Sequence, residues 1–213
     1  MGTVGGMDMG GLDAARARAG RKRVSSRAML EEAACELFLE QTYGGTTIEQ
    51  IAQRAGVSRN TFFNYFEAKS DVLWSGVDDS VDILAEELGA QSPDAPVMQQ
   101  VRSALLGTAA RLSPGAIPLA ITQWETMGVA AELQASGLSR FLRLAEVVEH
   151  HIAAAAPTES RSVPARAAAF AVIAAAASAG AAWALGGVER RPLASYVDEA
   201  VTPVTDGYGR LVR

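Results

Sequence analysis

Two short helical patterns joined by a tight turn, within residues 46–66, constrain the fold of this chain more than any other feature. Ile48 and Ile51 are three residues apart, which places them on one face of a helix. Thr46 followed by Glu49 has the spacing of a capping box, in which two side chains bond to free amides at a helix N-terminus. The pattern therefore predicts a short helix that begins near residue 46.

The turn that follows this helix reads Ala55-Gly56-Val57-Ser58. A small alanine lets two helices approach closely, and Gly56 accepts the left-handed backbone that ends many helices. Ser58 is a good N-cap for a next helix, which we expect to extend from Ser58 to Tyr65. Two short helices joined in this way form a helix-turn-helix, whose second helix enters the major groove of DNA.

The outer face of that second helix carries polar and aromatic residues that suit DNA, namely Arg59, Asn60, Phe63 and Asn64. Arg and Asn side chains pair bidentately with the edges of guanine and adenine, respectively. The alternative is an ordinary helical hairpin with a polar exposed face. It leaves unexplained the upstream residues 14–27, which contain six Lys or Arg and no acidic residue.

The distribution of charge separates the N-terminal part from the rest of the chain. Residues 1–70 have a net charge of +1, whereas residues 71–213 have a net charge of −6. A basic head on an acidic body indicates a local contact with a polyanion rather than general coating of nucleic acid. The basic segment has the composition of a flexible arm, and two interpretations stay open: it reaches into an adjacent minor groove, or it is a solvated tail that adds non-specific attraction.

The remainder of the chain is helical in pattern as well. Leu30, Leu37 and Phe38 recur at helical spacing ahead of the turn motif. No segment alternates like a strand, so we expect an all-α protein of about nine helices, with a three-helix helix-turn-helix domain followed by a helical bundle. The expected helices span residues 25–42, 46–55, 58–65, 69–89, 95–112, 115–127, 130–155, 164–186 and 193–201, separated by breaks at Gly or Pro.

Residues 25–74 resemble the DNA-binding domain of the tetracycline-repressor (TetR) family. The matching stretches are Leu30 to Phe38, Thr46 to Ala52, Ala55 to Ser58, Thr61 to Phe66, and Lys69. Residues 1–13 are rich in Gly and Met without periodicity, so together with the basic residues that follow we expect a disordered basic arm at 1–24. The resemblance implies a DNA-binding domain at 25–68 and a domain for ligand binding and dimerisation at 69–213. It also implies a cytoplasmic homodimer that binds double-stranded DNA at a palindromic operator, responds to a small-molecule effector, and usually represses transcription.

Carried over to this chain, the family's DNA contacts fall on the helix-turn-helix and its flanks. Phe63 stands where the family commonly has tyrosine, which removes a phosphate hydrogen bond and allows contact with a thymine methyl group. Ala68 stands where the family tends to have a capping residue, so the amides there are available to bind a phosphate. Thr47, Tyr65 and Lys69 are expected at phosphates. The complete expected set is Arg23, Thr47, Ser58, Arg59, Asn60, Thr61, Phe63, Asn64, Tyr65 and Lys69.

A narrower similarity concerns regulators of the mycofactocin system, a TetR subgroup of actinobacteria that responds to acyl-CoA. It rests on Phe62-Phe63, Tyr65-Phe66, Lys69, Asp71 and Trp74. This resemblance makes acyl-CoA the first effector to test.

Four large side chains, Trp124, Met127, Phe141 and Trp183, stand out in a body otherwise rich in Ala, Gly and Leu. A bundle short of bulky side chains leaves a cavity, and aromatic and Met residues line small-molecule pockets well. We therefore expect these four residues to contact an apolar effector. The alternative for each is that it fills the core or the dimer interface.

Residues 167–188 contain no charged residue over 22 positions, which is long enough to cross a bilayer. The segment is mostly alanine, and its small side chains favour a tightly packed soluble helix over a membrane span. We expect residues 165–185 to form the dimer interface together with the helix around Tyr196. Ala176 and Gly180 are expected at the closest approach.

No catalytic or metal-binding pattern occurs in the sequence, so we expect no enzyme activity and no cofactor. His150 and His151 are adjacent and cannot face one metal from a helix. Cys35 is the single cysteine, which excludes an intramolecular disulfide, and we expect it in the core rather than as a redox sensor. The alternative class is a helical small-molecule or lipid-binding protein whose N-terminal head contacts protein rather than DNA.

Overall fold

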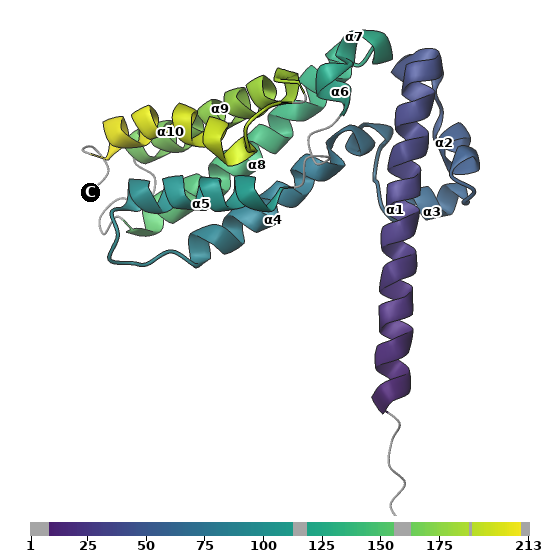
Figure 1. Ribbon diagram of the computed structural model, residues 1–213, viewed down its shortest axis with the longest axis horizontal. Coiled ribbons are helices and arrows are strands. Elements are labelled where there is room, and N and C mark those ends of the chain that lie inside the picture. The colour runs from purple at the N-terminus through teal and green to yellow at the C-terminus, as the bar shows by residue number, and fades with distance from the viewer. Residues whose placement is uncertain (1–8, 113–118, 156–162, 188, 210–213) are drawn as a thin grey trace, which may run out of the picture. The chain divides into compact units, whose positions relative to one another are not determined.

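The computed structural model describes residues 9–112, 119–155, 163–187 and 189–209, and these ranges contain helices and no strand (Figure 1). The chain divides into two units, Met1–Val72 and Leu73–Arg213. The all-α prediction is therefore confirmed for the described part of the chain. It contains ten α-helices and a 3₁₀ helix, where about nine helices were expected.

The first unit is built on the long helix α1 (Met9–Gly45), with the short helices α2 (Ile48–Arg54) and α3 (Arg59–Phe63) packed beside its C-terminal half (Figure 1). Apolar side chains from all three helices meet at its centre and are almost completely buried. These side chains are Leu30, Ala34, Leu37, Phe38, Ile51, Ala52 and Phe62, and Phe66 from the segment after α3 is buried as well. The periodicity in the sequence predicted this core.

The N-terminus of α1 differs from the sequence prediction. The structure continues α1 back to Met9, whereas a disordered arm was expected over residues 1–24. The reason is intrinsic propensity, because residues 14–19 read Ala-Ala-Arg-Ala-Arg-Ala and both residue types favour helix. Residues 1–8 lie outside the described residues.

The second unit is a bundle of helices with two short helices between its second and third long ones. The 3₁₀ helix η1 (Lys69–Trp74) crosses from the first unit into it. Its α-helices are α4 (Ser75–Gly89), α5 (Val97–Arg111), α6 (Leu119–Thr122), α7 (Trp124–Met127), α8 (Ala130–Ala155), α9 (Val163–Leu185) and α10 (Leu193–Tyr208). Helix α10 lies along both α9 and α5, and α8 packs against α9 and α4 (Figure 1).

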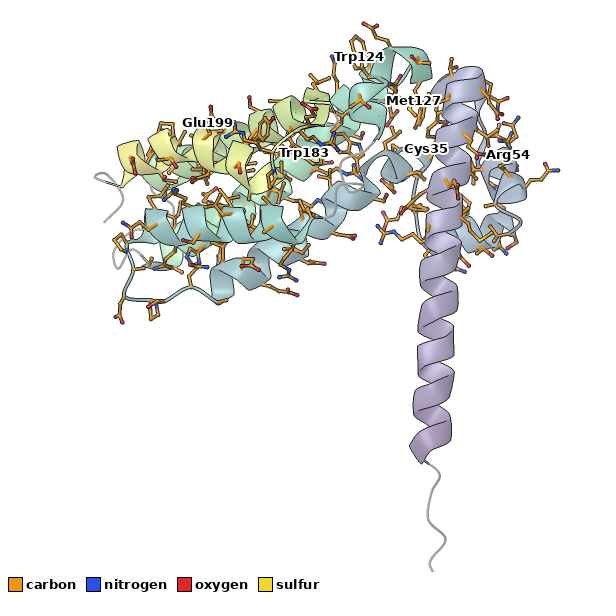
Figure 2. The ribbon with its side chains drawn as sticks, in the orientation of Figure 1. Cys35, Arg54, Trp124, Met127, Trp183 and Glu199 are labelled. Carbon is orange, nitrogen blue, oxygen red and sulfur yellow. The ribbon has the colours of Figure 1, made fainter. Side chains whose placement is uncertain are left out.

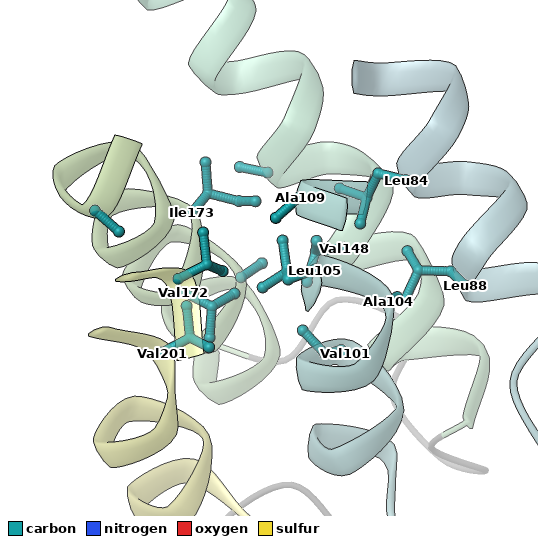
Figure 3. Close-up of a cluster of buried hydrophobic side chains, with 14 of the residues drawn as sticks. Leu84, Leu88, Val101, Ala104, Leu105, Ala109, Val148, Val172, Ile173 and Val201 are labelled. Carbon is teal, nitrogen blue, oxygen red and sulfur yellow. The ribbon is translucent and has the colours of Figure 1, made fainter. Parts of the chain in front are cut away.

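The core of the second unit draws small and branched apolar side chains from all five long helices. Figure 3 shows Leu84 and Leu88 of α4 facing a row on α5 and residues of α8, α9 and α10. The labelled members are Leu84, Leu88, Val101, Ala104, Leu105, Ala109, Val148, Val172, Ile173 and Val201. Because the row on α5 contains two alanines, the helices approach closely around it.

From residue 69 onward, three helices differ from those expected from the sequence. The segment expected as one helix over 69–89 is η1 followed by α4, and that expected over 115–127 contains α6 and α7. Residues 113–118 lie outside the described residues. Pro203 was expected to end the last helix but lies inside α10. Burial explains this, because Val201 and Thr205 on either side of Pro203 are both buried and hold the helix in place.

Helix α9 is long and apolar enough to cross a membrane by length and composition, and 39% of its most apolar window is buried inside the protein. It packs against α8 and α10, with Ala165, Ala168, Ala169 and Val172 buried. Its other side is exposed and still apolar, with Ala174, Ser178, Ala182 and Leu185 along one stripe. A core helix of a soluble protein passes the same composition test, so length and composition alone do not make α9 a membrane span.

Candidate nucleic-acid interface and ligand cavity

Helix α2 begins with a complete capping box, one residue later than the sequence suggested. Thr47 is the N-cap, and its Oγ1 accepts a hydrogen bond of 3.2 Å from the Gln50 amide. The Gln50 side chain in turn accepts from the Thr47 amide at 2.8 Å. The expected box of Thr46 and Glu49 is therefore wrong by one position.

Thr46 is buried and does not cap α2. Its hydroxyl donates to the Thr42 carbonyl at 2.8 Å, near the C-terminus of α1. Thr42 has a φ of 67°, a left-handed value that is unusual for a β-branched residue. The Thr46 hydroxyl thus holds the strained turn that aims α2.

The turn between α2 and α3 has the geometry that the sequence predicted. Gly56 has a φ of 67°, and Ala55 is buried between the helices. Ser58 is the N-cap of α3, where its Oγ accepts from the Thr61 amide at 3.1 Å. Helix α3 is shorter than expected and ends at Phe63, with Asn64 as its C-cap.

The outer face of α3 presents the predicted base-reading residues to solvent. Asn60 and Asn64 are exposed, and neither side chain has a hydrogen bond within the described residues. The Phe63 ring is 44% exposed, which is unusual for a phenylalanine in a soluble domain. Thr61 and Tyr65 are half-buried beside this face. An exposed set of Asn and aromatic side chains on a short helix suits contact with base edges.

Arg59 opens the recognition helix and is paired across the turn. Its Nε lies 2.8 Å from Oε1 of Glu49 on α2. Its guanidinium carbon also lies 5.4 Å from the centre of the Phe63 ring. Sequence reasoning missed Glu49 as a member of this site because its capping role seemed sufficient.

Lys69 does not point outward as a phosphate contact does. Its ammonium group donates to the carbonyl oxygens of Tyr43 and Thr46, both at 2.7 Å, and lies 4.0 Å from the Tyr43 ring centre. These carbonyls belong to the end of α1 and the residue before the α2 N-cap. The geometry gives Lys69 a structural contact inside the first unit.

The amides at Ala68, expected to be free for a phosphate, are also occupied. The Asp71 carboxylate accepts from the Ala68 amide at 2.8 Å and from the Glu67 amide at 3.1 Å. Asp71 therefore replaces the missing capping residue. Arg23, the remaining expected contact, lies within α1, and its side chain is outside the described part of the structure.

Helix α2 is also tied to α1 by a salt bridge on the surface. Arg54 lies beside the C-terminal half of α1, and its guanidinium pairs with Glu40 at 2.7 Å and Glu36 at 3.0 Å (Figure 2). The Glu40 pair is bidentate, which fixes orientation more than it stabilises. Cys35 lies on the same stretch of α1, half-buried, and burial raises the pKa of its thiol. A raised pKa lowers the thiolate fraction, as expected for an unreactive cysteine.

The second unit contains an apolar cavity of about 290 Å³. Residues of α4, α5, α8, α9 and α10 line it, including Leu84, Leu105, Phe141, Ile173 and Val197. Trp74 closes one part of the wall, and Gly137 makes room for it, since a Cβ there would lie 3.3 Å from the indole ring. The cavity is at the small end of the range for ligand pockets.

Among the described residues, one charged side chain lines the cavity, that of Arg140 of α8, which is 7% exposed. Its Nε and Nη2 donate to the two oxygens of Asp78 on α4, at 2.8 and 2.9 Å. Its guanidinium also lies 5.3 Å from the Trp74 ring centre, and the Trp74 indole donates to Ser136 Oγ at 2.8 Å. This network ties the start of α4 to α8. An arginine on the apolar face of α8 was the sequence signal that could have revealed it.

Only one of the four expected pocket residues lines this cavity. Phe141 does, packed edge-on against Phe170 at 5.5 Å. Met127 is completely buried, whereas Trp124, at the other end of the short helix α7, is 45% exposed (Figure 2). Trp183 is buried between α9 and the loop to α10, where its indole donates to the Arg191 carbonyl at 2.9 Å. The geometry places Met127 and Trp183 in the core, which was the alternative for these side chains.

The described residues contain no cluster of three or more His, Cys, Asp or Glu that could hold a metal ion. His151 bonds instead to the side chain of Gln100 at 2.8 Å.

Comparison with known proteins gives a matching family model for each of the two units. The family model described as bacterial regulatory proteins, tetR family, matches residues 30–73. The model described as the MftR C-terminal domain matches residues 95–209, which is more than half of the chain.

Two curated relatives and a solved structure agree with these matches. MftR of Mycobacterium tuberculosis, described as a mycofactocin biosynthesis transcriptional regulator, is 32% identical over 57 residues, which are 27% of this chain and 29% of the relative. The HTH-type transcriptional regulator TcmR of Streptomyces glaucescens is 46% identical over 52 residues, 24% of this chain and 23% of the relative. The chain thus matches less than a third of the length of these relatives.

NalD, the secondary repressor of the MexAB-OprM multidrug efflux pump in Pseudomonas aeruginosa, has the same fold. Its structure aligns with a TM-score of 0.57 and 21% identity over 87% of this chain and 97% of the NalD chain.

The helix-turn-helix and the helical second unit define a DNA-binding regulatory protein rather than an enzyme. The chain belongs to the TetR family of transcriptional regulators, with a C-terminal domain of the MftR type.

Proposed function

We propose that this chain is a ligand-responsive repressor that binds a palindromic operator as a homodimer and is released by a small apolar effector. The observation that carries the proposal is the presence, in one chain, of an exposed recognition helix and an apolar cavity. Residues 25–68 contact DNA, and residues 69–213 bind the effector and form the dimer. The protein acts in the cytoplasm, where its DNA is.

The residues on the exposed face of α3 contact the base edges. Arg59 and Asn60 lie at its start and Asn64 at its end, within reach of neighbouring base edges. Phe63 offers an apolar surface to a thymine methyl group. The hydroxyl groups that flank this face bind the DNA phosphate backbone and so position the helix. They belong to Thr47, Ser58, Thr61 and Tyr65.

The dimer interface is the exposed stripe of α9, with Ala174, Ser178, Ala182 and Leu185. Small side chains allow the matching helix of a second copy to approach closely, and Leu185, 72% exposed, gains most from burial. Ala176 and Gly180, expected from the sequence at this interface, line the cavity instead. A two-fold dimer presents two recognition helices about 34 Å apart, which requires an inverted repeat in the DNA.

The effector occupies the cavity and acts through α4. Gly76, Val77, Ser80 and Leu84 of this helix line the cavity, and α4 follows the first unit directly in sequence. A ligand that fits one position of α4 better than another shifts the protein between two states. A hundredfold loss of DNA affinity requires about 2.7 kcal/mol of differential binding, which is within the usual range for such coupling.

Acyl-CoA is the first effector to test. Its support is the resemblance to mycofactocin regulators and the match of residues 95–209 to the MftR C-terminal domain. The apolar lining suits the acyl chain, and the one buried charge, on Arg140, is already balanced by Asp78.

The test begins with selection of bound duplexes from a random library by the full chain. A selected inverted repeat supports the operator, and its release by an acyl-CoA panel in a gel-shift assay supports the effector. If no motif is selected, the DNA-binding proposal fails, and a small-molecule carrier whose head contacts protein becomes the better interpretation. If a motif is selected but no acyl-CoA releases it, only the effector assignment fails.

A further inference from the structure

Glu49 and Arg59 form an ion pair across the helix-turn-helix, on the surface that faces DNA in the proposed function. The carboxylate lies on α2 and the guanidinium on the first residue of α3, with Glu49 Oε1 2.8 Å from Arg59 Nε. Both side chains are 59% exposed. Phe63, one turn further along α3, places its ring 5.4 Å from the guanidinium carbon.

The pairing uses one edge of the guanidinium and leaves another available. The Glu49 carboxylate lies against Nε as an ion pair, and no nitrogen of the Arg59 guanidinium has a hydrogen bond within the described residues. A guanidinium can approach the O6 and N7 atoms of guanine through its two Nη atoms or through Nε and one Nη. Because the Glu49 carboxylate lies beside Nε, it obstructs the approach through that edge and favours the approach through the two Nη atoms.

The stability of the unit does not account for this pair. Exposed ion pairs contribute little to stability, because water screens them and two long side chains lose freedom. Helix α2 already has its capping box, and α3 has Ser58 as its N-cap. A carboxylate near the DNA also repels phosphates, so it weakens DNA binding unless another effect of the same side chain favours binding.

We propose that Glu49 is a positioning residue for base readout, which holds Arg59 with its Nη edge toward a guanine and away from the phosphates. The inference rests on the proposed function. In the free protein, Glu49 neutralises a guanidinium that would otherwise bind any phosphate. Glu49 and Phe63 also hold the Arg59 side chain in place before DNA binds. The arginine therefore loses less conformational freedom when the specific complex forms.

Four variants of the full chain separate this role from simple charge. Glu49→Gln removes the charge, whereas Glu49→Asp keeps the charge on a side chain too short to hold Nε in the same place. Glu32→Gln is the matched control, because it makes the same change in net charge at an exposed α1 residue with no bond within the described residues. Arg59→Ala identifies the base pair that Arg59 contacts.

The experiment selects duplexes from a random library with each variant and then measures affinity for the wild-type motif and for a scrambled duplex at several salt concentrations. At the Arg59-dependent base pair, we expect both Glu49 variants to lose about fivefold or more of the preference for guanine. Glu49→Gln should also bind the scrambled duplex more tightly, with a log-log salt slope steeper by about 0.9, since one more phosphate contact forms.

Each outcome decides the inference. Unchanged guanine preference in both Glu49 variants overturns it, as does a change that Glu32→Gln reproduces. An added effect of Glu49→Gln on base preference in the Arg59→Ala background also contradicts it, because Glu49 acts through Arg59. If the wild-type chain selects no motif, both the proposed function and this inference are wrong. If the wild-type chain selects a motif and the Glu49 variants keep the same guanine preference, only this inference is wrong.

Discussion

The ammonium group of Lys69 donates a 2.7 Å hydrogen bond to the carbonyl oxygen of Thr46, the residue that precedes the N-cap of α2. A second bond of equal length goes to Tyr43, near the end of α1. Lys69 thus satisfies two carbonyls at the bend between these helices, where the negative end of α1 favours a cation. The lysine orients the helix-turn-helix from within.

Lys69→Ala should therefore lower the stability of the first unit. We expect a loss of about 2 kcal/mol in the free energy of unfolding, since two carbonyls lose a charged donor. Urea unfolding followed by circular dichroism measures it. Arg54→Ala, which breaks an exposed pair, should cost less. If Lys69→Ala keeps full stability but weakens binding to all DNA, Lys69 is a phosphate contact after all.

Asn60→Ala and Asn64→Ala should relax base preference at separate positions of the operator. Both side chains are exposed on the recognition helix without hydrogen bonds within the described residues. A lost bidentate contact costs about 1–3 kcal/mol of discrimination at one base pair. Competition binding with single-base operator variants measures this. Gln53→Ala, an exposed amide on α2, is the control and should leave base preference unchanged.

The sequence allowed the helix-turn-helix to be predicted because its signals are local. Gly56 and Ser58 have special backbone roles that depend only on their neighbours. The capping register was wrong by one residue, because Thr46 and Thr47 are equally good caps in isolation. The buried hydroxyl is that of Thr46 because the folded chain places the carbonyls of Thr42 and Leu37 within its reach.

The cavity could not be predicted in the same way because its polar contacts connect distant residues. Asp78 and Arg140 are 62 positions apart, and no short-range spacing relates them. Met127 and Trp183 were expected to line the pocket because their side chains are large, yet large apolar side chains are equally common in a core. Which role a side chain takes is decided by how five helices pack, and this is a property of the whole second unit.

Stability should fall as the pH decreases from 7.5 to 5.5, partly through His151. Burial, and then the charge of His150, lower the pKa of His151 below its usual range. The buried Gln100 donates its amide to the Ala95 carbonyl at 2.7 Å, so its oxygen faces His151. Because the unfolded chain binds this proton at higher pH than the folded chain, acidification favours unfolding in the window around and below pH 6.5.

The effect of His151 is measured from the slope of unfolding free energy against pH. It should lie well below the limit of about 1.4 kcal/mol per pH unit for one proton, because the ring is only half-buried. His151→Gln should flatten the slope in this window. His150→Gln should retain most of it, since burial is the larger cause. Equal slopes in wild type and His151→Gln would assign the pH dependence to other groups.

If the proposed α9 interface is correct, Ser178→Arg should convert the proposed dimer into monomers. Ser178 lies in the exposed stripe of α9, and in the proposed dimer a two-fold axis would bring the same residue of both copies close together. Two arginines there add bulk and like charge, so dissociation should be visible in light scattering at micromolar concentration. Operator affinity should fall with it, since one recognition helix reads half a site. An unchanged dimer would place the interface on another surface.

Gly180→Leu, two residues away on the same helix, should leave the dimer intact and remove the response to effector. Gly180 lines the cavity, and a Cβ built there has no atom within 4 Å, so the larger side chain extends into empty space. Leucine fills part of the volume of about 290 Å³ that the proposed effector would occupy. Trp74 reports on occupancy, because it lines the cavity whereas Trp124 and Trp183 do not. The wild-type chain should change its fluorescence and release the operator with the same ligand, and Gly180→Leu should do neither while binding the operator normally. Release that persists in Gly180→Leu would show that the effector binds elsewhere.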